Sequence, residues 1–195
     1  MNKPIVIACT GKRGAGKSEF VKMLVANYGF VDVKFADPLK NMLRAMYSTA
    51  GLDPTTIERK IEGDLKEQTC DYLLGHTPRH AMQTLGTEWR KMIATELWAE
   101  MLVRRVMSGD YGDRIAISDY RFPDEEGVAL STLDAKVVRI TRPTADAVND
   151  KASQHASEAL IDKIVADTIL HNDGTLNDLR SKIGSYMKDE FNLSK

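Results

Sequence analysis

The sequence predicts an α/β fold, a parallel five-stranded sheet with helices on both faces, and three observations lead to it. An apolar run at residues 4–9 is followed by a glycine-rich loop at 11–18 and then by an amphipathic helical pattern. Residues 115–119 form an apolar run closed by an acid, as expected for a strand buried on both faces. Strand-like segments alternate with helical patterns, which indicates parallel strands joined by crossover helices. The length of 195 residues fits a single domain.

The glycine-rich loop fits the pattern G-x-x-x-x-G-K-[ST]. Glycines let the backbone turn tightly with positive φ, so that successive N–H groups point inward and hold an oligophosphate. The helix that begins near Lys17 adds its positive end to this anion site. Lys17 would bring a charge to the β and γ phosphates, and the Ser18 hydroxyl would offer an oxygen to Mg²⁺. The alternative is a turn that binds nothing, but the flanking strand and helix favour a phosphate site formed by Gly11, Lys12, Arg13, Gly14, Ala15, Gly16, Lys17 and Ser18.

The segment after the first helix is predicted to contain a second strand and a helical region. Apolar and polar residues alternate over 31–35 as in a half-buried strand. Asp37-Pro38 is typical of an N-cap followed by proline in the first turn, and the helix that it starts ends at Gly51. Residues 51–76 are charged and weakly periodic, so we expect a mobile helical insertion there.

The remaining elements are two helices and the last strands of the sheet. One helix is expected to begin at Thr77 and another at Thr87, the second carrying its apolar side chains inward, namely Met92, Ile93, Leu97, Met101 and Leu102. Two further short strands are expected at 136–140 and 167–172.

Composition restricts the class of ligand and the compartment. Lys and Arg total 27 against 28 Asp and Glu, a net charge of −1, so the chain lacks the broad positive charge that attracts a nucleic acid polymer. Two cysteines without a C-x-x-C motif suit a reducing cytoplasm. The apolar run before the loop is too short for a signal peptide or a membrane span. The sequence therefore predicts a cytoplasmic protein with a small-molecule ligand and no membrane partner.

Asp119 and Arg121 stand at the end of the second apolar run and just beyond it. A carboxylate at the tip of a buried strand, downstream of such a loop, suggests a ligand of Mg²⁺, whereas the alternative is a polar strand end or helix cap. Arg121 could clamp a phosphate with two parallel hydrogen bonds, or it could form a surface salt bridge with Glu125. The residues by themselves leave both alternatives open for Arg121.

Several segments together resemble the bacteriophage-type deoxynucleoside monophosphate kinases, in order from about residue 4 to 180. Besides the loop they are Phe35-Ala36-Asp37-Pro38-Leu39-Lys40, Gln83-Thr84-Leu85-Gly86-Thr87-Glu88-Trp89-Arg90, Ser118-Asp119-Tyr120-Arg121-Phe122-Pro123-Asp124-Glu125, Arg139-Ile140-Thr141-Arg142-Pro143, His155-Ala156-Ser157-Glu158 and Asn172-Asp173-Gly174-Thr175. The Gly-Thr-Glu-Trp and Asp-x-Arg-Phe-Pro segments are the distinctive ones. The resemblance implies a P-loop nucleoside monophosphate kinase fold and transfer of the γ-phosphate of ATP, with Mg²⁺, to a deoxynucleoside 5′-monophosphate.

The resemblance also implies an acceptor site within a helical region of about residues 37–107. Its members would be Asp37, Lys40, Arg79, Gln83, Glu88, Trp89, Arg90 and Arg121. Some of these residues have a structural alternative. The alternative for Asp37 is that it serves merely as a helix cap, and the alternative for Trp89 is that it belongs to a hydrophobic core. Glu88 and Arg90 could form a solvated helix face, and Gln83 could bond to the backbone.

The family likeness further implies a short lid at about residues 143–157 and an adenine-side loop. Arg139 and Arg142 precede the lid, whose only basic residue is Lys151, so that Arg13, Arg121 or Arg142 would have to neutralise part of the transition state. The adenine-side loop would use Asn172 and Gly174, although the same residues read by themselves as a turn followed by a helix cap.

The predicted chemistry is electrostatic, since phosphoryl transfer needs alignment of two nucleotides and neutralisation of charge. Lys17, Arg121, Arg142 and Mg²⁺ held through Ser18 and Asp119 would supply it. Other readings are another small P-loop kinase, for dephospho-coenzyme A or ribonucleotides, and a nucleotide-binding regulatory switch. The base, the choice between ribose and deoxyribose, and assembly into a homodimer stay open. If a phage encodes the chain, the compartment is the host cell cytoplasm.

Overall fold

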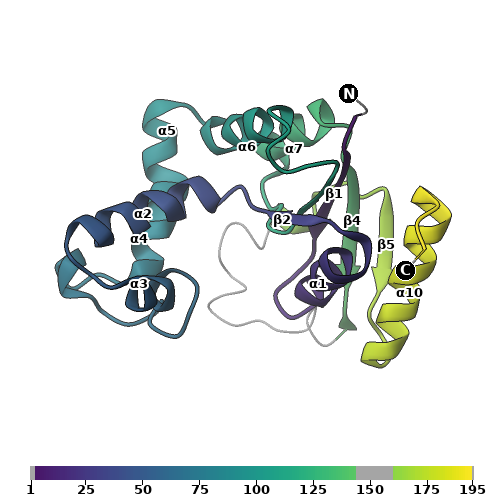
Figure 1. Cartoon of the computed structure of the whole chain (residues 1–195), viewed down its shortest axis with the longest axis horizontal. Coiled ribbons are helices and arrows are strands. Elements are labelled where there is room, and N and C mark those ends of the chain that lie inside the picture. The colour runs from purple at the N-terminus through teal and green to yellow at the C-terminus, as the bar shows by residue number, and fades with distance from the viewer. Residues whose placement is uncertain (1–2, 144–159, 195) are drawn as a thin grey trace. The chain divides into compact units, whose positions relative to one another are not determined.

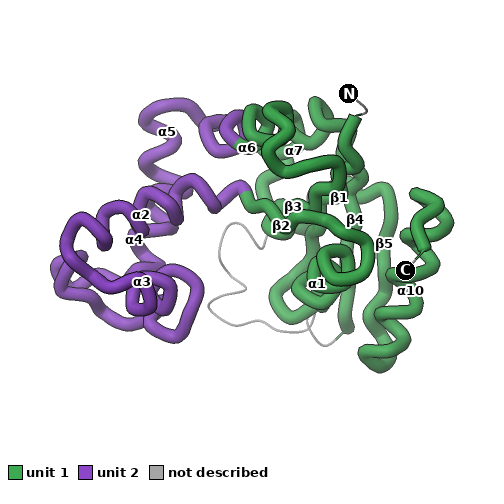
Figure 2. The backbone as a smooth tube through the Cα atoms, viewed as in Figure 1, with its two compact units in different colours: residues 1–34, 102–195 green, residues 35–101 purple. Residues whose placement is uncertain are grey.

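The computed structural model describes residues 3–143 and 160–194. The chain divides into two compact units, one formed by residues 1–34 with 102–195 and the other by residues 35–101 (Figure 2). The first unit contains the sheet and the second is helical.

The sheet of the first unit has five parallel strands, as the sequence predicts (Figure 1). Its order is β2-β3-β1-β4-β5, and the strands are β1 (Ile5–Thr10), β2 (Val31–Val33), β3 (Arg114–Ile117), β4 (Lys136–Thr141) and β5 (Thr168–His171). The predicted strand at 115–119 is two residues too long at its end. β2 pairs with β3 only as far as Ile117, the Ser118 N–H donates to the Val33 carbonyl, and the chain then leaves the sheet.

Helices cover both faces of this sheet. Ile7 and Cys9 of β1 pack in one apolar cluster with buried side chains of α1 (Lys17–Tyr28) and α10 (Leu176–Phe191). Successive side chains of a strand point to opposite faces, and Val6 and Ala8 on the other face are also buried. The same unit also contains α7 (Pro123–Thr132) and the part of α6 (Leu97–Met107) that follows residue 101, and both helices contribute buried side chains.

The second unit has a hydrophobic core of its own. Its helices are α2 (Asp37–Thr49), α3 (Pro54–Ile61), the 3₁₀ turn η1 (Asp71–Leu73), α4 (Pro78–Thr84), the π-helix η2 (Leu85–Trp89), α5 (Arg90–Ile93) and the first residues of α6. Their buried apolar side chains form one cluster, Leu39, Leu43, Tyr47, Ile57, Ile61, Cys70, Met82 and Trp98. Cys70 is buried although its sequence neighbours are polar, because the fold and not the local pattern decides its burial.

Two expectations for this unit were wrong. Asp37 is not an N-cap, because Ala36 holds that position and Asp37 is the first helical residue. The single helix expected from residue 87 is instead η2, α5 and α6, with a break at Ala94 in an extended conformation. Met92 and Ile93 therefore do not point inward, and their side chains are 85% and 57% exposed. Met101 is also exposed, at 42%.

None of the helices within residues 3–143 and 160–194 has both the length and the apolar character needed to cross a membrane.

Candidate active site

The glycine-rich loop joins β1 to α1 at the carboxyl end of the sheet. Gly11, Gly14 and Gly16 have φ angles of 140°, 82° and 114°, which side-chain-bearing residues rarely adopt. Gly16 is the N-cap of α1 and has no side chain to satisfy the first helical amides. Amides at a helix start together with the positive end of the helix dipole form an anion site. The loop thus has the backbone geometry that phosphate binding requires.

Lys17 closes the loop on itself. Its ammonium donates to the Gly11 carbonyl and, at 2.9 Å, to the Lys12 carbonyl. Lys12 in turn lies 3.5 Å from the Asp162 carboxylate. Beneath the loop, burial raises the pKa of the Cys9 thiol to about 12, so the thiol stays protonated and unreactive at neutral pH.

Asn172 holds the loop from the neighbouring end of β5. Its side chain is buried, its Nδ2 donates to the Ala15 carbonyl at 2.8 Å, and its backbone N–H donates to the Thr141 carbonyl at 2.8 Å. A Cβ placed on Gly16 would lie 2.7 Å from the same Nδ2, so the amide packs directly on the loop backbone. The sequence implied an adenine contact for Asn172, and the structure gives its side-chain amide a hydrogen bond to the loop.

Gly174 belongs to the turn before α10. Thr175 is the N-cap of this helix and forms a capping box with Asp178, whose Oδ2 would lie 2.6 Å from a Cβ on Gly174. The turn and helix cap read from the sequence are therefore confirmed.

Replacing Asn172 by Asp tests its hold on the loop, because Asp has the same size but presents an acceptor to the Ala15 carbonyl. We expect the free energy of unfolding to fall by about 1–3 kcal/mol, as for a buried acceptor that loses its donor. We also expect the loop to bind nucleotide about tenfold more weakly. Calorimetric titration and denaturant unfolding measure both. Asn177→Asp, an exposed position in the first turn of α10, should change neither, and an unaltered Asn172→Asp protein would contradict this role.

The segment that leaves β3 carries Asp119 and Arg121 and is fixed at two points. The Thr10 hydroxyl at the end of β1 donates to the Tyr120 carbonyl at 3.1 Å. A carboxylate oxygen of Glu126 accepts the backbone N–H groups of Arg121 at 2.7 Å and Phe122 at 3.0 Å. Asp119 is thereby placed beside the end of β1, from which the phosphate loop starts.

Glu126 was missed by the sequence reading because it ends a run of three acids, Asp124, Glu125 and Glu126, that looks like a solvated face. It is only 6% exposed. The sequence does contain a signal for the role of Glu126, which is the proline at the start of α7. A carboxylate one turn after such a helix start can accept hydrogen bonds from the amides that precede the helix.

We expect Glu126→Gln to destabilise the folded chain by about 1–2 kcal/mol, because a neutral oxygen replaces a charged acceptor of two backbone N–H groups. Denaturant unfolding measures this loss. Asp124→Asn removes an exposed acid from the same turn and should lower the free energy of unfolding by only about 0.5 kcal/mol, through the helix dipole. Equal stabilities of the two variants would argue against this anchoring role.

Arg139 and Arg142 have different surroundings. The Nη2 of Arg139 donates to the Ile161 carbonyl at 3.0 Å and to the Ile164 carbonyl, so this guanidinium ties β4 to the segment before β5. Arg142 follows β4 and is exposed. Of the expected lid at 143–157, all but Pro143 lies outside the described residues.

In the helical unit, Lys40 is buried and its ammonium lies 2.7 Å from the Glu62 carboxylate. Arg44 and Lys66 approach the same carboxylate at 3.5 Å and 3.8 Å. Burial lowers the pKa of Lys66, and the charges of Lys40 and Arg79 also lower it, against the opposing effect of Glu62. Positive charge is thus gathered around one carboxylate.

Asp37 begins α2 and Arg121 follows β3, whereas the five other predicted acceptor residues lie on α4, η2 and α5. Gln83 and Glu88 are exposed, Arg90 is 4% exposed, and Arg79 pairs with Glu67 at 2.7 Å. Trp89 stacks on Trp98 with ring centroids 5.5 Å apart and packs against the core of this unit. This packing favours the core alternative for Trp89. A π-helix is rare and is often found at functional sites, and here it contains the Gly-Thr-Glu-Trp segment.

A magnesium ion would find oxygen ligands at Ser18 and Asp119. Ser18 lies in the first turn of α1 and Asp119 follows β3, whose strand neighbours β1 in parallel, so both belong to the carboxyl edge of the sheet. Magnesium in phosphoryl-transfer sites takes one or two protein ligands and completes its shell with phosphate oxygens and water. The donor set fits that requirement, and no cluster of three or more His, Cys, Asp or Glu ligands occurs among the residues that the structure describes.

The fold and the loop define a class, the P-loop nucleotide-binding proteins with a kinase-like sheet. A profile of the deoxynucleotide monophosphate kinases matches residues 61–183, which is more than half of the chain. The chain therefore belongs to the deoxynucleotide monophosphate kinase family and is a phosphotransferase that uses nucleotides.

Individual proteins agree with this assignment. The chain is 28% identical over 197 residues to an Acanthamoeba polyphaga mimivirus protein provisionally named deoxynucleotide monophosphate kinase, with 92% of this chain and 94% of that protein covered. In fold it is similar to a solved Thermus thermophilus protein and to dephospho-CoA kinase from Campylobacter jejuni, each with a TM-score of 0.53. Their identities are 18% and 16%, with 96% of this chain and 98% of each of theirs covered, and they show the fold alone.

Proposed function

We propose that this enzyme transfers the γ-phosphate of Mg-ATP to the phosphate of a deoxynucleoside 5′-monophosphate and releases ADP and the deoxynucleoside diphosphate. The observation that carries the proposal is the phosphate loop, with three glycines at positive φ and Lys17 folded over it. An acceptor phosphate is already ionised at neutral pH, so the reaction needs no strong general base.

Charge neutralisation is the task of the remaining residues in this proposal. Lys17 leaves the loop carbonyls for the β and γ phosphates, Ser18 and Asp119 hold Mg²⁺, and Arg121 and Arg142 face the transferring group. When bound, the magnesium ion polarises the phosphate oxygens. The anchors at Thr10 and Glu126 support this arrangement, because they fix the segment on which Asp119 and Arg121 lie.

Acceptor recognition belongs, in the same proposal, to the helical region at about residues 37–107. In this proposal the acceptor nucleotide contacts Asp37, Lys40, Arg79 and Arg90, together with the exposed polar side chains of α4 and η2. Residues 143–157 would act as the lid. The substrate pool of such an enzyme is that of the cytoplasm, or of the host cytoplasm for a phage-encoded chain.

A coupled assay of ADP release tests the proposal. Mg-ATP is supplied with each common deoxynucleoside and ribonucleoside monophosphate and with dephospho-coenzyme A, and Lys17→Ala serves as the inactive control. We expect saturable ADP release with one or more deoxynucleoside monophosphates. Turnover only with dephospho-coenzyme A would select the second candidate, with which the fold shared with the Campylobacter jejuni dephospho-CoA kinase is compatible. ATP hydrolysis that no acceptor stimulates would favour a regulatory switch.

Asp119→Asn tests the magnesium site. The variant keeps the size of the side chain but loses a charge, so we expect the maximal rate to fall about a hundredfold and half-maximal activity to need more Mg²⁺. Rates are measured over a magnesium titration at saturating ATP. Asp113→Asn, an exposed position before β3, is the control and should reproduce the unmodified curve. An unshifted magnesium midpoint in Asp119→Asn would remove Asp119 from the metal site.

A further inference from the structure

Two histidines of the helical unit lie face to face on its surface. The rings of His76 and His80 are stacked, with centroids 4.8 Å apart and ring planes inclined by 23°. Both residues are exposed, and within the part of the chain that the structure describes neither imidazole forms a hydrogen bond or an ion pair. The pair therefore carries ring nitrogens that the described fold does not use.

The backbone holds both histidines in this position. The Cys70 N–H donates to the His76 carbonyl at 3.0 Å and closes a turn, within which the His76 N–H donates to the Leu73 carbonyl at 3.0 Å. On the other side, the Thr77 hydroxyl, which caps α4, accepts the His80 N–H at 3.1 Å. Because both backbone positions are already fixed, a ligand that joins the two rings has little chain to order.

We propose that His76 and His80 together bind one divalent transition-metal ion, such as Zn²⁺, whose remaining positions water fills. Two histidines at i and i+4 on one helix face bind a single zinc ion in the H-E-x-x-H motif, and these two have the same separation in sequence. Zinc lies about 2.0–2.1 Å from each ligating nitrogen, so two imidazoles on one tetrahedral ion have centroids about 5 Å apart. The observed 4.8 Å agrees with that spacing.

The surroundings decide which ion the pair takes. Imidazole nitrogen suits zinc, copper and nickel, whereas Mg²⁺ prefers oxygen ligands. Cys70 adds no thiolate, because its side chain is buried in the core of the helical unit. Arg79 stands between the two histidines in sequence, but its guanidinium pairs with the Glu67 carboxylate at 2.7 Å, which compensates the charge that would repel a cation. The magnesium ion of a nucleotide complex is therefore a poor competitor for this site.

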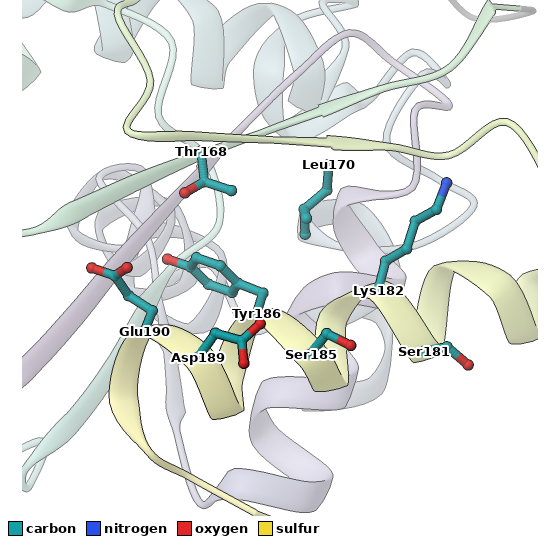
Figure 3. Close-up of a pocket in the computed structure, with 8 residues that line it drawn as sticks. All are labelled: Thr168, Leu170, Ser181, Lys182, Ser185, Tyr186, Asp189 and Glu190. Carbon is teal, nitrogen blue, oxygen red and sulfur yellow. The ribbon is translucent and has the colours of Figure 1, made fainter.

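Carboxylates on α10 offer a second place for a surface ion. A groove of about 480 Å³ between β5 and α10 is lined by several polar side chains, Asp189 and Glu190 among them (Figure 3). Glu190 pairs with Lys136 at 3.2 Å, and carboxylate oxygens suit hard ions such as Mg²⁺ and Ca²⁺. Asp189→Asn is therefore the control for zinc that binds to surface acids.

Calorimetric titration with ZnCl₂ tests the proposal on the full chain, prepared without a polyhistidine tag and without nucleotide. We expect one equivalent of Zn²⁺ to bind, with an affinity that excess MgCl₂ leaves unchanged. His76→Asn and His80→Asn should each weaken binding about tenfold or more, and the double variant should lose little beyond that, because one imidazole alone cannot chelate. His171→Asn, which removes another exposed histidine, and Asp189→Asn should bind zinc as the unmodified chain does.

Nuclear magnetic resonance gives a second measurement that does not depend on variants. Substoichiometric Cu²⁺ should broaden the imidazole signals of His76 and His80 at the same ratio of ion to protein and leave the signal of His171 sharp. A chain that binds no zinc overturns the proposal, and so does a single variant with unchanged affinity or broadening of one ring of the pair without the other. Losses that add in the double variant would mean two independent sites and would also overturn it. The inference does not rest on the proposed function, because neither histidine takes part in nucleotide binding there.

Discussion

We expect Lys17→Ala to lower the acceptor-dependent release of ADP by about a thousandfold, because a charge placed where phosphate charge develops is worth several kcal/mol in a site that excludes water. We expect the free energy of unfolding to change by about 1 kcal/mol or less, since the ammonium is partly exposed and its bonds to the Gly11 and Lys12 carbonyls lie within one loop. Steady-state kinetics and denaturant unfolding measure the two quantities on the same preparations.

The control for Lys17 is Lys22→Ala, which removes an exposed lysine from the same helix. This control variant has the same net charge as Lys17→Ala and should retain the rate of the unmodified enzyme. If Lys17→Ala turns over at nearly the rate of the unmodified enzyme, Lys17 has no role in catalysis. If the variant loses both rate and stability, the substitution acts by impairing folding.

Gly11→Ala should destabilise the chain by about 2–4 kcal/mol and abolish nucleotide binding. A Cβ at this position would collide with the Ile140 carbonyl of β4, and the φ angle of 140° is strained for alanine. The collision is with backbone, so relief requires that β4 or the loop shift. Denaturant unfolding and calorimetric titration with Mg-ATP record the two effects.

Gly29→Ala separates strain from collision. Gly29 ends α1 at a φ of 70°, but a Cβ there meets no atom within 4 Å. We expect Gly29→Ala to lower the free energy of unfolding by about 1 kcal/mol, which is the cost of a left-handed backbone conformation alone. Equal losses for the two alanine variants would show that packing against β4 is not what demands glycine at position 11.

The sheet could be predicted from the sequence because its signals are local. The apolar run, the glycine loop and the amphipathic α1 lie within about 30 neighbouring residues, and buried parallel strands have a recognisable composition. The end of β3 was misplaced because it depends on where β2 stops, a contact between segments more than 80 residues apart in the chain.

The helical unit was harder to predict for the same reason. Cys70 and Trp98 enter one core from distant segments, and no periodic pattern indicates that they meet. The apolar spacing of Met92 and Ile93 suits a buried helix face, yet the break at Ala94 leaves both exposed. Contacts such as that of Asn172 with Ala15, 157 residues apart, cannot be read from a single sequence.

The π-helix at Leu85–Trp89 sets the rotation of α5, the short helix that follows it directly. Its wider turn takes up one residue more than an α-helical turn would, and each residue of an α-helix advances the side chains by about 100°. A regular α-helix formed by the same residues would instead rotate Arg90, which is 4% exposed, by about 100° from its buried position. The extra residue of the wider turn therefore keeps that guanidinium inside the helical unit.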